Sequence, residues 1–114
     1  MPWKLKRLRQ CAKCPWKVGT DPHQIPGGYS EQRHCDLADT IAIPGALPAT
    51  GAPLRIMACH ESPVEYEAHC VGWLMNQLGP GNNIALRISM LDCENIGNVQ
   101  LDGPQHRTFE ETLP

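Results

Sequence analysis

The sequence predicts a small, mostly helical α+β domain that is rich in loops and organised around a four-cysteine metal site. Three observations predict this fold class. The chain has 114 residues and 5% aromatic residues, which allows one domain with a thin apolar core. Ten glycines and eleven prolines place much of it in turns. Six cysteines offer the crosslink, covalent or through a metal, that so small a core needs.

The N-terminus bears on whether these cysteines form disulfides or bind metal. Residues 1–9 are basic and no apolar run follows them, which argues against a secretory signal. No stretch approaches the roughly 18 apolar residues of a membrane span. We therefore expect a cytoplasmic protein without membrane contact. In a reducing compartment, a C-x2-C pair indicates a metal or redox site rather than a structural disulfide.

The first helix is expected over residues 31–42, after a loop that is rich in Gly and Pro. Ser30 offers an N-cap, and His34, Leu37 and Ile41 recur at helical spacing. Breaker residues over 44–53 exclude a regular element there. Residues 54–59 then read as a short strand that delivers Cys59 at its end.

A second helix is expected over residues 63–78. Ser62, Pro63 and Glu65 form a capping box with proline at the first helical position, and the glycines after Leu78 end the helix. Tyr66, Cys70, Trp73, Leu74 and Leu78 then share one face, so that Cys70 would lie two turns inside the helix.

The third element covers residues 84–91, where a strand and a helix compete. Alternating apolar residues favour a strand, but Asn82 and Asn83 after a Gly-rich turn form a helix start, and we predict a helix. Residues 94–114 are mostly polar, and Phe109 is the one aromatic residue in this segment. We therefore divide the chain into a basic arm (1–10), a metal-binding domain (11–93) and an extended polar tail (94–114).

The expected site consists of Cys11, Cys14, Cys59 and Cys70. The turn between the cysteines of a C-x2-C pair folds their side chains to the same side, and four thiolates suit zinc or an iron–sulfur cluster. The alternative is four buried, inert thiols. That alternative fits Cys70 but fits Cys11 and Cys14 poorly, because they follow a charged arm. Cys35 and Cys93 are expected to be ordinary thiols.

The metal is either zinc, which we favour, or a [4Fe–4S] cluster, for which Cys-Pro after a ligand is a familiar flank. His60 adjoins Cys59, and neighbouring residues seldom both bind one ion, so His60 is expected beside the ligands rather than among them. Trp16 and Trp73 could form a dry shell around the centre.

Two catalytic readings are weaker. A thioredoxin-like dithiol needs a βαβ setting that the pattern around Cys11 and Cys14 lacks. His60-Glu61 is half of a hydrolase or deaminase motif without its second half. A zinc ion saturated by four cysteines has no open position for water, so the site is expected to be structural and the protein not an enzyme.

The net charge of −2 is unevenly distributed. Residues 1–17 contain six basic residues and no acid, whereas residues 92–114 contain five acids and one arginine. Either the arm binds nucleic acid phosphates, or the two ends offset each other. A pI near 6.2 is not typical of a dedicated DNA-binding protein. The nucleic-acid contacts would be Lys4, Lys6, Arg7 and Arg9.

Three motifs together resemble those of a known family. They are Cys-x-x-Cys-Pro-Trp at 11–16, Met-Ala-Cys-His at 57–60 and His-Cys-Val-Gly-Trp-Leu at 69–74. The combination is similar to a family of small uncharacterised cysteine-containing proteins encoded by bacteria, notably actinobacteria, and by phages. The resemblance covers about residues 11–90. It implies a small cytoplasmic protein that shares these four cysteines and has no established activity; Cys35 and the residues after Cys93 lie outside it.

The function expected from these observations is a structural zinc module. It would be a phage or bacterial accessory protein that binds a host protein or nucleic acid. The alternative is a [4Fe–4S] protein with a redox or sensing role.

Overall fold

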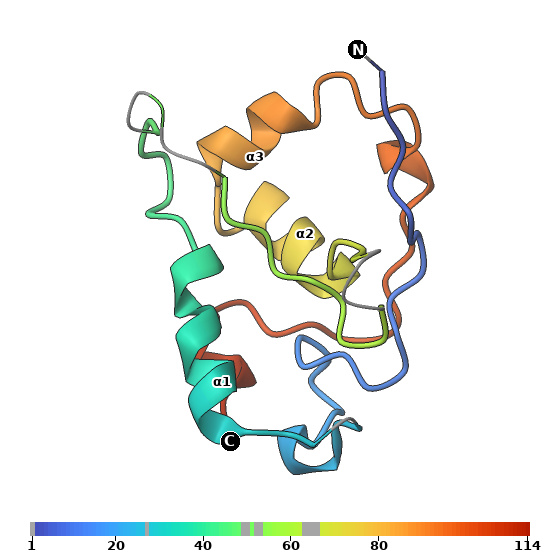
Figure 1. Ribbon diagram of the computed structural model, residues 1–114, viewed down its shortest axis with the longest axis vertical. Helices are drawn as coiled ribbons and strands as arrows, with labels where there is room; N and C mark the ends of the chain where they lie inside the picture. The colour runs from blue at the N-terminus through green and yellow to red at the C-terminus, as the bar shows by residue number, and fades with distance from the viewer. Residues whose placement is uncertain (1, 27, 49–50, 52–53, 63–66) are drawn as a thin grey trace.

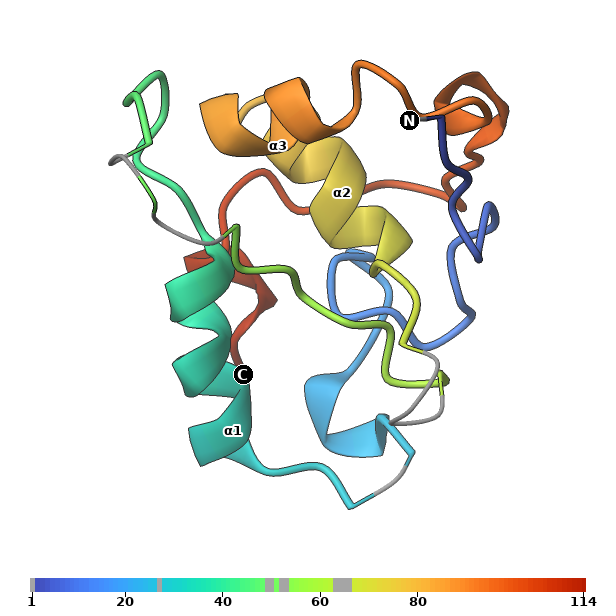
Figure 2. The same cartoon turned by 45° about the horizontal axis from the view of Figure 1, so that its top comes forward.

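The computed structural model describes residues 2–26, 28–48, 51, 54–62 and 67–114. Its α-helices are α1 (Glu31–Asp36), α2 (Val71–Leu78) and α3 (Ile84–Ser89). Short 3₁₀ helices are η1 (Pro22–Gln24), η2 (Leu37–Thr40), η4 (Ile96–Asn98) and η5 (Glu110–Thr112). The remaining described residues are mostly loop. Helix α2 lies at the centre, with α3 packed against it and α1 to one side (Figures 1 and 2).

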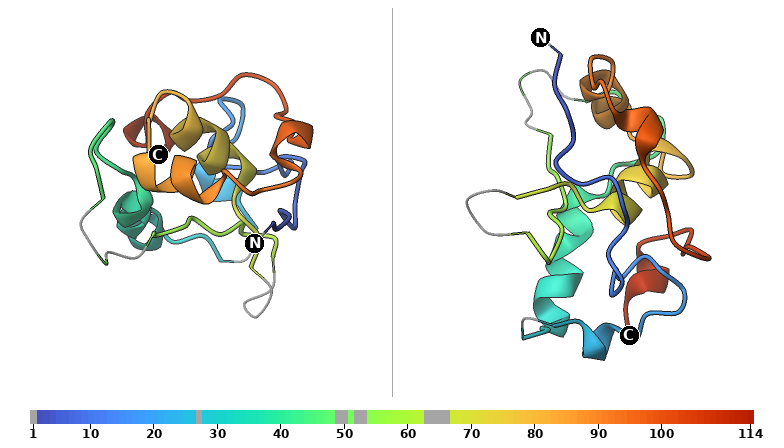
Figure 3. Two further views of the ribbon diagram at one scale, coloured as in Figure 1. Left: turned by 90° about the horizontal axis from the view of Figure 1, so that it is seen from above. Right: turned by 90° about the vertical axis from the view of Figure 1, so that its right-hand side faces the viewer.

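The described residues form isolated β-bridges and no regular strand. Parallel bridges join Trp3 to Cys93 and Arg9 to Gln100, and an antiparallel bridge joins Lys17 to Gln105. The N-terminal segment therefore runs beside the segment that follows α3, as the blue and orange-red traces show in Figures 1 and 3. The two ends of the chain thus lie side by side.

The core surrounds α2. Trp16, Trp73, Leu74 and Leu86 are fully buried, and Trp73 donates its Nε1–H to the carbonyl oxygen of Thr40 at 3.0 Å. Trp73 thereby ties α2 to the end of η2. None of the helices in the described part of the chain is long and apolar enough to cross a bilayer.

The helix predicted over residues 31–42 is confirmed at its start. The Ser30 hydroxyl accepts a hydrogen bond from the backbone N–H of Arg33 at 3.3 Å, as an N-cap does. The α-helix ends at Asp36, and η2 continues the same path to Thr40. A final turn with 3₁₀ geometry is common at helix ends.

The helix predicted over residues 63–78 is wrong over residues 67–70 and is confirmed from Val71 onward. Residues 63–66, which include Pro63, Glu65 and Tyr66 of the predicted start, lie outside the described residues. Residues 67–70 are not helical, because Cys59 N–H donates to Ala68 O at 2.7 Å and Cys70 N–H donates to Met57 O at 2.8 Å. These bonds hold the chain extended, so α2 begins at Val71. Cys70 is its N-cap residue rather than a residue two turns inside the helix.

Ser62, expected to cap that helix, has a different role. Its hydroxyl donates to the carbonyl oxygen of Cys59 at 2.7 Å and closes the turn after this cysteine. The strand predicted over 54–59 is also wrong, because it is reduced to one antiparallel bridge between Ala58 and His69.

Helix α3 confirms the choice of helix over strand for residues 84–91. The Asn83 side chain accepts the backbone N–H of Leu86 at 3.1 Å and caps the helix. The segment after Cys93, expected to be an extended polar tail, lies against the N-terminal segment and places Phe109 in the core with 5% of its surface exposed.

Candidate metal centre

Two loop segments and the start of α2 position the four cysteines expected to bind metal. Cys11 and Cys14 occupy a tight turn, in which Cys14 N–H donates to Cys11 O at 3.3 Å. Cys59 and Cys70 flank the antiparallel bridge between Ala58 and His69. The bridge joins two segments whose paired residues are eleven positions apart in the sequence. Cys59 and Cys70 therefore both approach the turn at Cys11 and Cys14 from the same side.

All four thiols are buried, with between 0% and 4% of each residue exposed. The sulfur atoms of Cys14 and Cys70 lie 3.8 Å apart. Cys11 interacts with both Cys14 and Cys59 through thiol hydrogen bonds. The contacts therefore run from Cys59 through Cys11 and Cys14 to Cys70. All six cysteines of the chain are free thiols.

The thiols perturb one another's ionisation. Hydrogen bonds from Cys11 lower the pKa of Cys14 and the pKa of Cys59, the latter to about 6. The hydrogen bond with Cys14 and desolvation raise the pKa of Cys11 and of Cys70. Two thiols thus act as donors to two sulfurs that favour the thiolate. Thiolates are the form that binds soft metal ions.

His60 joins the cluster at its outer side. Its Nε2 atom lies 3.1 Å from the Cys11 sulfur. One donor atom each from Cys11, His60 and Glu61 lie within 4.8 Å of one another, so this group could hold a metal ion. No three of the four cysteine sulfurs lie within 4.8 Å of one another. Glu61 also pairs with Arg7 at 3.3 Å, which closes the cluster on the solvent side.

The two tryptophans lie close to the cysteines. Trp16 is 1% exposed and donates its Nε1–H to the Met57 sulfur at 3.4 Å. Trp73 lies on α2 one turn after Cys70 and is fully buried. Both tryptophans are thus buried in the core within three residues of a clustered cysteine.

Two further residues support the cluster, and the sequence reading did not single them out. Gly72 has no room for a side chain, because a Cβ atom there would lie 2.8 Å from the Cys14 sulfur. Gln10 is 7% exposed, exchanges amide hydrogen bonds with Gln105 at 2.7 Å, and helps to lower the pKa of Cys14. The position of Gly72 inside the His-Cys-Val-Gly-Trp-Leu motif could have indicated its role. No pattern in the sequence indicates a role for Gln10.

The cysteines outside the cluster differ in burial. Cys35 is exposed on α1. Cys93 is buried at 8% exposure, and its thiol donates to the Asn95 side chain at 3.5 Å. Among the described residues, no contact joins Cys35 or Cys93 to the four clustered thiols.

Basic residues of the arm, and Lys17 after it, form ion pairs with acids from elsewhere in the chain. Lys4 lies 3.9 Å from Glu94, and Lys17 lies 2.6 Å from Asp102. Arg7 pairs with Glu61 and also donates its Nε–H to the carbonyl oxygen of Arg9 at 2.8 Å. Lys6 and Arg9 are exposed.

Comparison with known proteins places most of the chain in a family. A model of a family of unknown function, DUF6283, matches residues 6–111. The matched region extends beyond residues 11–90 on both sides and takes in most of the segment after Cys93. No curated protein and no solved structure matches the chain.

Proposed function

The chain belongs to this family of unknown function, and we propose that it is a non-enzymatic binding module held together by one metal centre. The ligands proposed are Cys11, Cys14, Cys59 and Cys70, and the metal is zinc. The observation that carries the proposal is the burial of these four free thiols in a chain of contacts where two loops meet the start of α2.

Zinc fits the donor chemistry. Thiolates are its preferred ligands in structural sites, and four of them leave no position for a reacting water. His60 would then donate its Nε2–H to the Cys11 sulfur, a contact of 3.1 Å that needs no direct bond to the metal. The ion would link the N-terminal turn to α2 in a domain that has few regular elements.

A [4Fe–4S] cluster is the second candidate, and the observation that favours it is that no three of the four cysteine sulfurs lie close together. One zinc ion with Zn–S bonds of about 2.3 Å in a tetrahedron holds its sulfurs roughly 3.8 Å apart. The sulfurs of Cys14 and Cys70 lie 3.8 Å apart, as one zinc ion would hold them, but no three of the four sulfurs are mutually within 4.8 Å. In a cubane each cysteine binds a different iron, so the sulfurs lie farther apart. A redox or sensing role would follow.

The partner proposed is a protein of the host cell. Lys4 and Arg7 already pair with carboxylates, which reduces the positive charge that the arm offers to phosphates. A nucleic-acid partner bound through Lys4, Lys6, Arg7 and Arg9 would need some of these pairs to open. That version predicts an affinity that falls steeply as salt is raised, and an affinity independent of salt would eliminate it.

The deciding experiment is elemental analysis with a visible spectrum on protein purified without oxygen. About one zinc per chain without colour supports the structural module. About four irons per chain with a broad band near 400 nm supports the cluster instead. Protein that is folded and carries neither metal overturns both forms of the proposal.

Two serine variants test the ligand set. Cys14→Ser is expected to lose the metal and the cooperative thermal transition, because metal-binding free energy in such domains is folding free energy. Cys35→Ser is the matched control, since this thiol is exposed on α1, and it should keep both. A Cys14→Ser protein with unchanged metal content and melting temperature would refute the ligand assignment.

A further inference from the structure

A cavity of about 220 Å³ lies between the start of α1 and the cysteine cluster. Ile25 and Leu37 contribute to its lining from the segment around α1. Pro15, Met57 and Cys70 contribute from the side of the cluster. The cavity is larger than the engineered apolar cavity of about 150 Å³ that holds a benzene molecule. A single aromatic ring with a small substituent can therefore fit.

Hydrogen bonds fix the state of His34 at the cavity wall. The Thr112 hydroxyl donates to Phe109 O at 2.6 Å, so it can only accept from His34 Nε2, which lies 3.1 Å away. The Nε2 atom is therefore protonated, and because burial lowers the pKa of His34, Nδ1 stays unprotonated and accepts the Tyr29 hydroxyl proton at 2.8 Å. His34 is thus a neutral imidazole with both nitrogens occupied. It presents a ring edge and no charge to the cavity.

Arg33 supplies a permanent positive charge to the same cavity. It is exposed and lines the cavity, which places it at the mouth. No aspartate or glutamate is among the described residues that line the cavity. Within the described part of the chain, no carboxylate forms an ion pair with the Arg33 guanidinium. The cavity therefore combines an apolar, ring-lined interior with one cation at its entrance.

We propose that this cavity binds a small aromatic carboxylic acid. The ring would lie between Leu37 and Met57, with the proline rings and the Tyr29 side chain beside it, and the carboxylate would pair with Arg33. The inference goes beyond the proposed function, and it assigns the ligand no contact with a metal ion. Cys70 and His60 contribute walls, and the ligand is held by Arg33 and the apolar residues.

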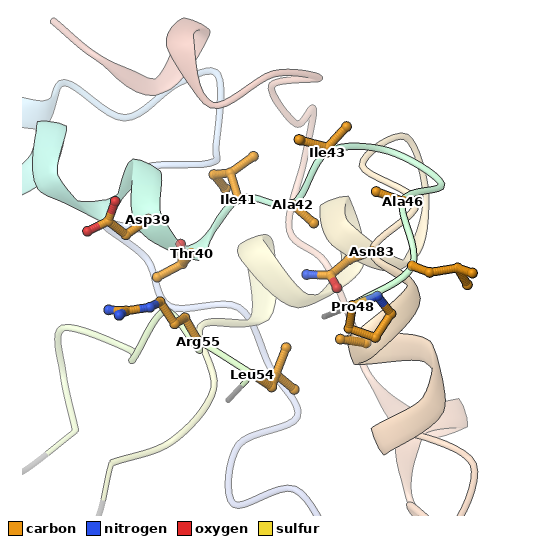
Figure 4. Close-up of a pocket in the computed structure, with 12 residues that line it drawn as sticks. Asp39, Thr40, Ile41, Ala42, Ile43, Ala46, Pro48, Leu54, Arg55 and Asn83 are labelled. Atoms are coloured by element: carbon orange, nitrogen blue, oxygen red, sulfur yellow. The ribbon is translucent and has the colours of Figure 1, made fainter. Parts of the chain in front are cut away.

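A second groove lacks this combination. It is lined by Ile41, Ile43, Leu54 and the oppositely charged Asp39 and Arg55 (Figure 4). Because a carboxylate and a guanidinium share its lining, it offers no preference for an anion. Arg55 therefore serves as a control cation for the cavity at Arg33.

The test is a titration of the full chain, with its metal content measured, followed by amide NMR. The three probes are benzoate, benzyl alcohol (the ring without the charge) and acetate (the charge without the ring). Benzoate should bind most tightly and shift the amides of residues 29–37 and 57–60. Arg33→Gln should weaken benzoate about fivefold and leave benzyl alcohol unchanged, as expected for an exposed charge pair. Arg55→Gln should change neither.

Three outcomes would overturn the proposal. They are equal affinity for benzoate and acetate, no effect of Arg33→Gln on benzoate, or shifted amides confined to the groove of Figure 4. Leu37→Trp, which fills the cavity, should abolish binding of both aromatic probes while the metal content is unchanged. If metal-free protein still binds benzoate, the domain folds without the metal, which counts against the metal proposal and leaves this one standing.

Discussion

At the scale of single residues, Gly72 shows how closely the chain approaches itself at the cysteine cluster. A Cβ atom there would lie 2.6 Å from Trp16 Cβ and 2.8 Å from the Cys14 sulfur. Real Cβ atoms do not make such contacts, so any larger residue must displace α2 from the turn at Cys11 and Cys14. Glycine is required here by packing rather than by backbone conformation.

Gly72→Ala should lower the free energy of unfolding by about 1–3 kcal/mol, as overpacking of a dense core does. It should also weaken metal binding, because the Cys14 sulfur is one of the displaced atoms. Chemical denaturation and metal competition measure the two effects. Gly97→Ala is the control: nothing lies within 4 Å of the added methyl group, so it should leave both values unchanged. Equal behaviour of the two variants would contradict the close packing.

His34 predicts a pH dependence of stability. Burial lowers its pKa below the ordinary value of 6.5, and the weaker attraction of Glu31 opposes the shift. The unfolded chain therefore binds a proton more readily than the folded one. The contribution of His34 is fully present above pH 6.5 and is lost as the pH falls through that value toward the folded pKa.

Replacing His34 should reduce the slope of unfolding free energy against pH below 6.5 by up to about one proton per chain. Denaturation of His34→Gln and of the wild type between pH 5 and pH 8 gives the two slopes. An unchanged slope for His34→Gln would mean that another group carries the pH dependence.

At the scale of elements, the connection between α2 and α3 is set by two amides. Asn83 caps α3 and donates its Nδ2–H to Gln77 Oε1 at 3.0 Å. The same Gln77 oxygen accepts the backbone N–H of Ala42 at 3.1 Å. Gln77 is fully buried, so one side chain joins α2, the start of α3 and the segment after η2.

Asn83→Ala should therefore lower the free energy of unfolding by about 1–2 kcal/mol. It removes a helix cap, which costs about 1 kcal/mol, and a buried hydrogen bond of Gln77. Ser30→Ala, at the less buried cap of α1, should cost about 0.5–1 kcal/mol. Chemical denaturation of both variants gives the comparison. Equal losses would show that Gln77 adds nothing to the cap.

At the scale of the whole molecule, the two ends of the chain are part of one structure. Bridges at Trp3–Cys93, Arg9–Gln100 and Lys17–Gln105 pair the ends along their length (Figure 3). Phe109 packs against Trp16, with ring centres 6.3 Å apart. Trp16 follows Cys14 by two residues. The C-terminal segment therefore covers the turn that carries half of the cysteine cluster.

Phe109→Ala should lower the free energy of unfolding by about 3–5 kcal/mol, as for other buried aromatic residues. Leu101→Ala is the control in the same segment, and because Leu101 is 42% exposed, its loss should be well under half as large. Thermal or chemical unfolding measures both. A small effect of Phe109→Ala would mean that residues 94–114 contribute little to the fold.

The sequence by itself determined the features that depend on near neighbours. The Ser30 and Asn83 side chains each cap the helix that follows them, and Gly79 ends α2, because these signals act within four residues. Spacing and local chemistry also selected Cys11, Cys14, Cys59 and Cys70, the four thiols that the fold buries in contact.

Only the tertiary structure decided what depends on distant partners. The capping box at Ser62 is a start signal that depends only on near neighbours. Backbone hydrogen bonds from Cys59 to Ala68 and from Cys70 to Met57 instead keep residues 67–70 extended, so α2 begins at Val71. The polar composition after Cys93 gives no sign of its pairing with the N-terminal segment, since bridge partners about ninety residues apart leave no local periodicity. Local helix propensity is overridden wherever long-range hydrogen bonds and burial contribute more to the free energy of folding.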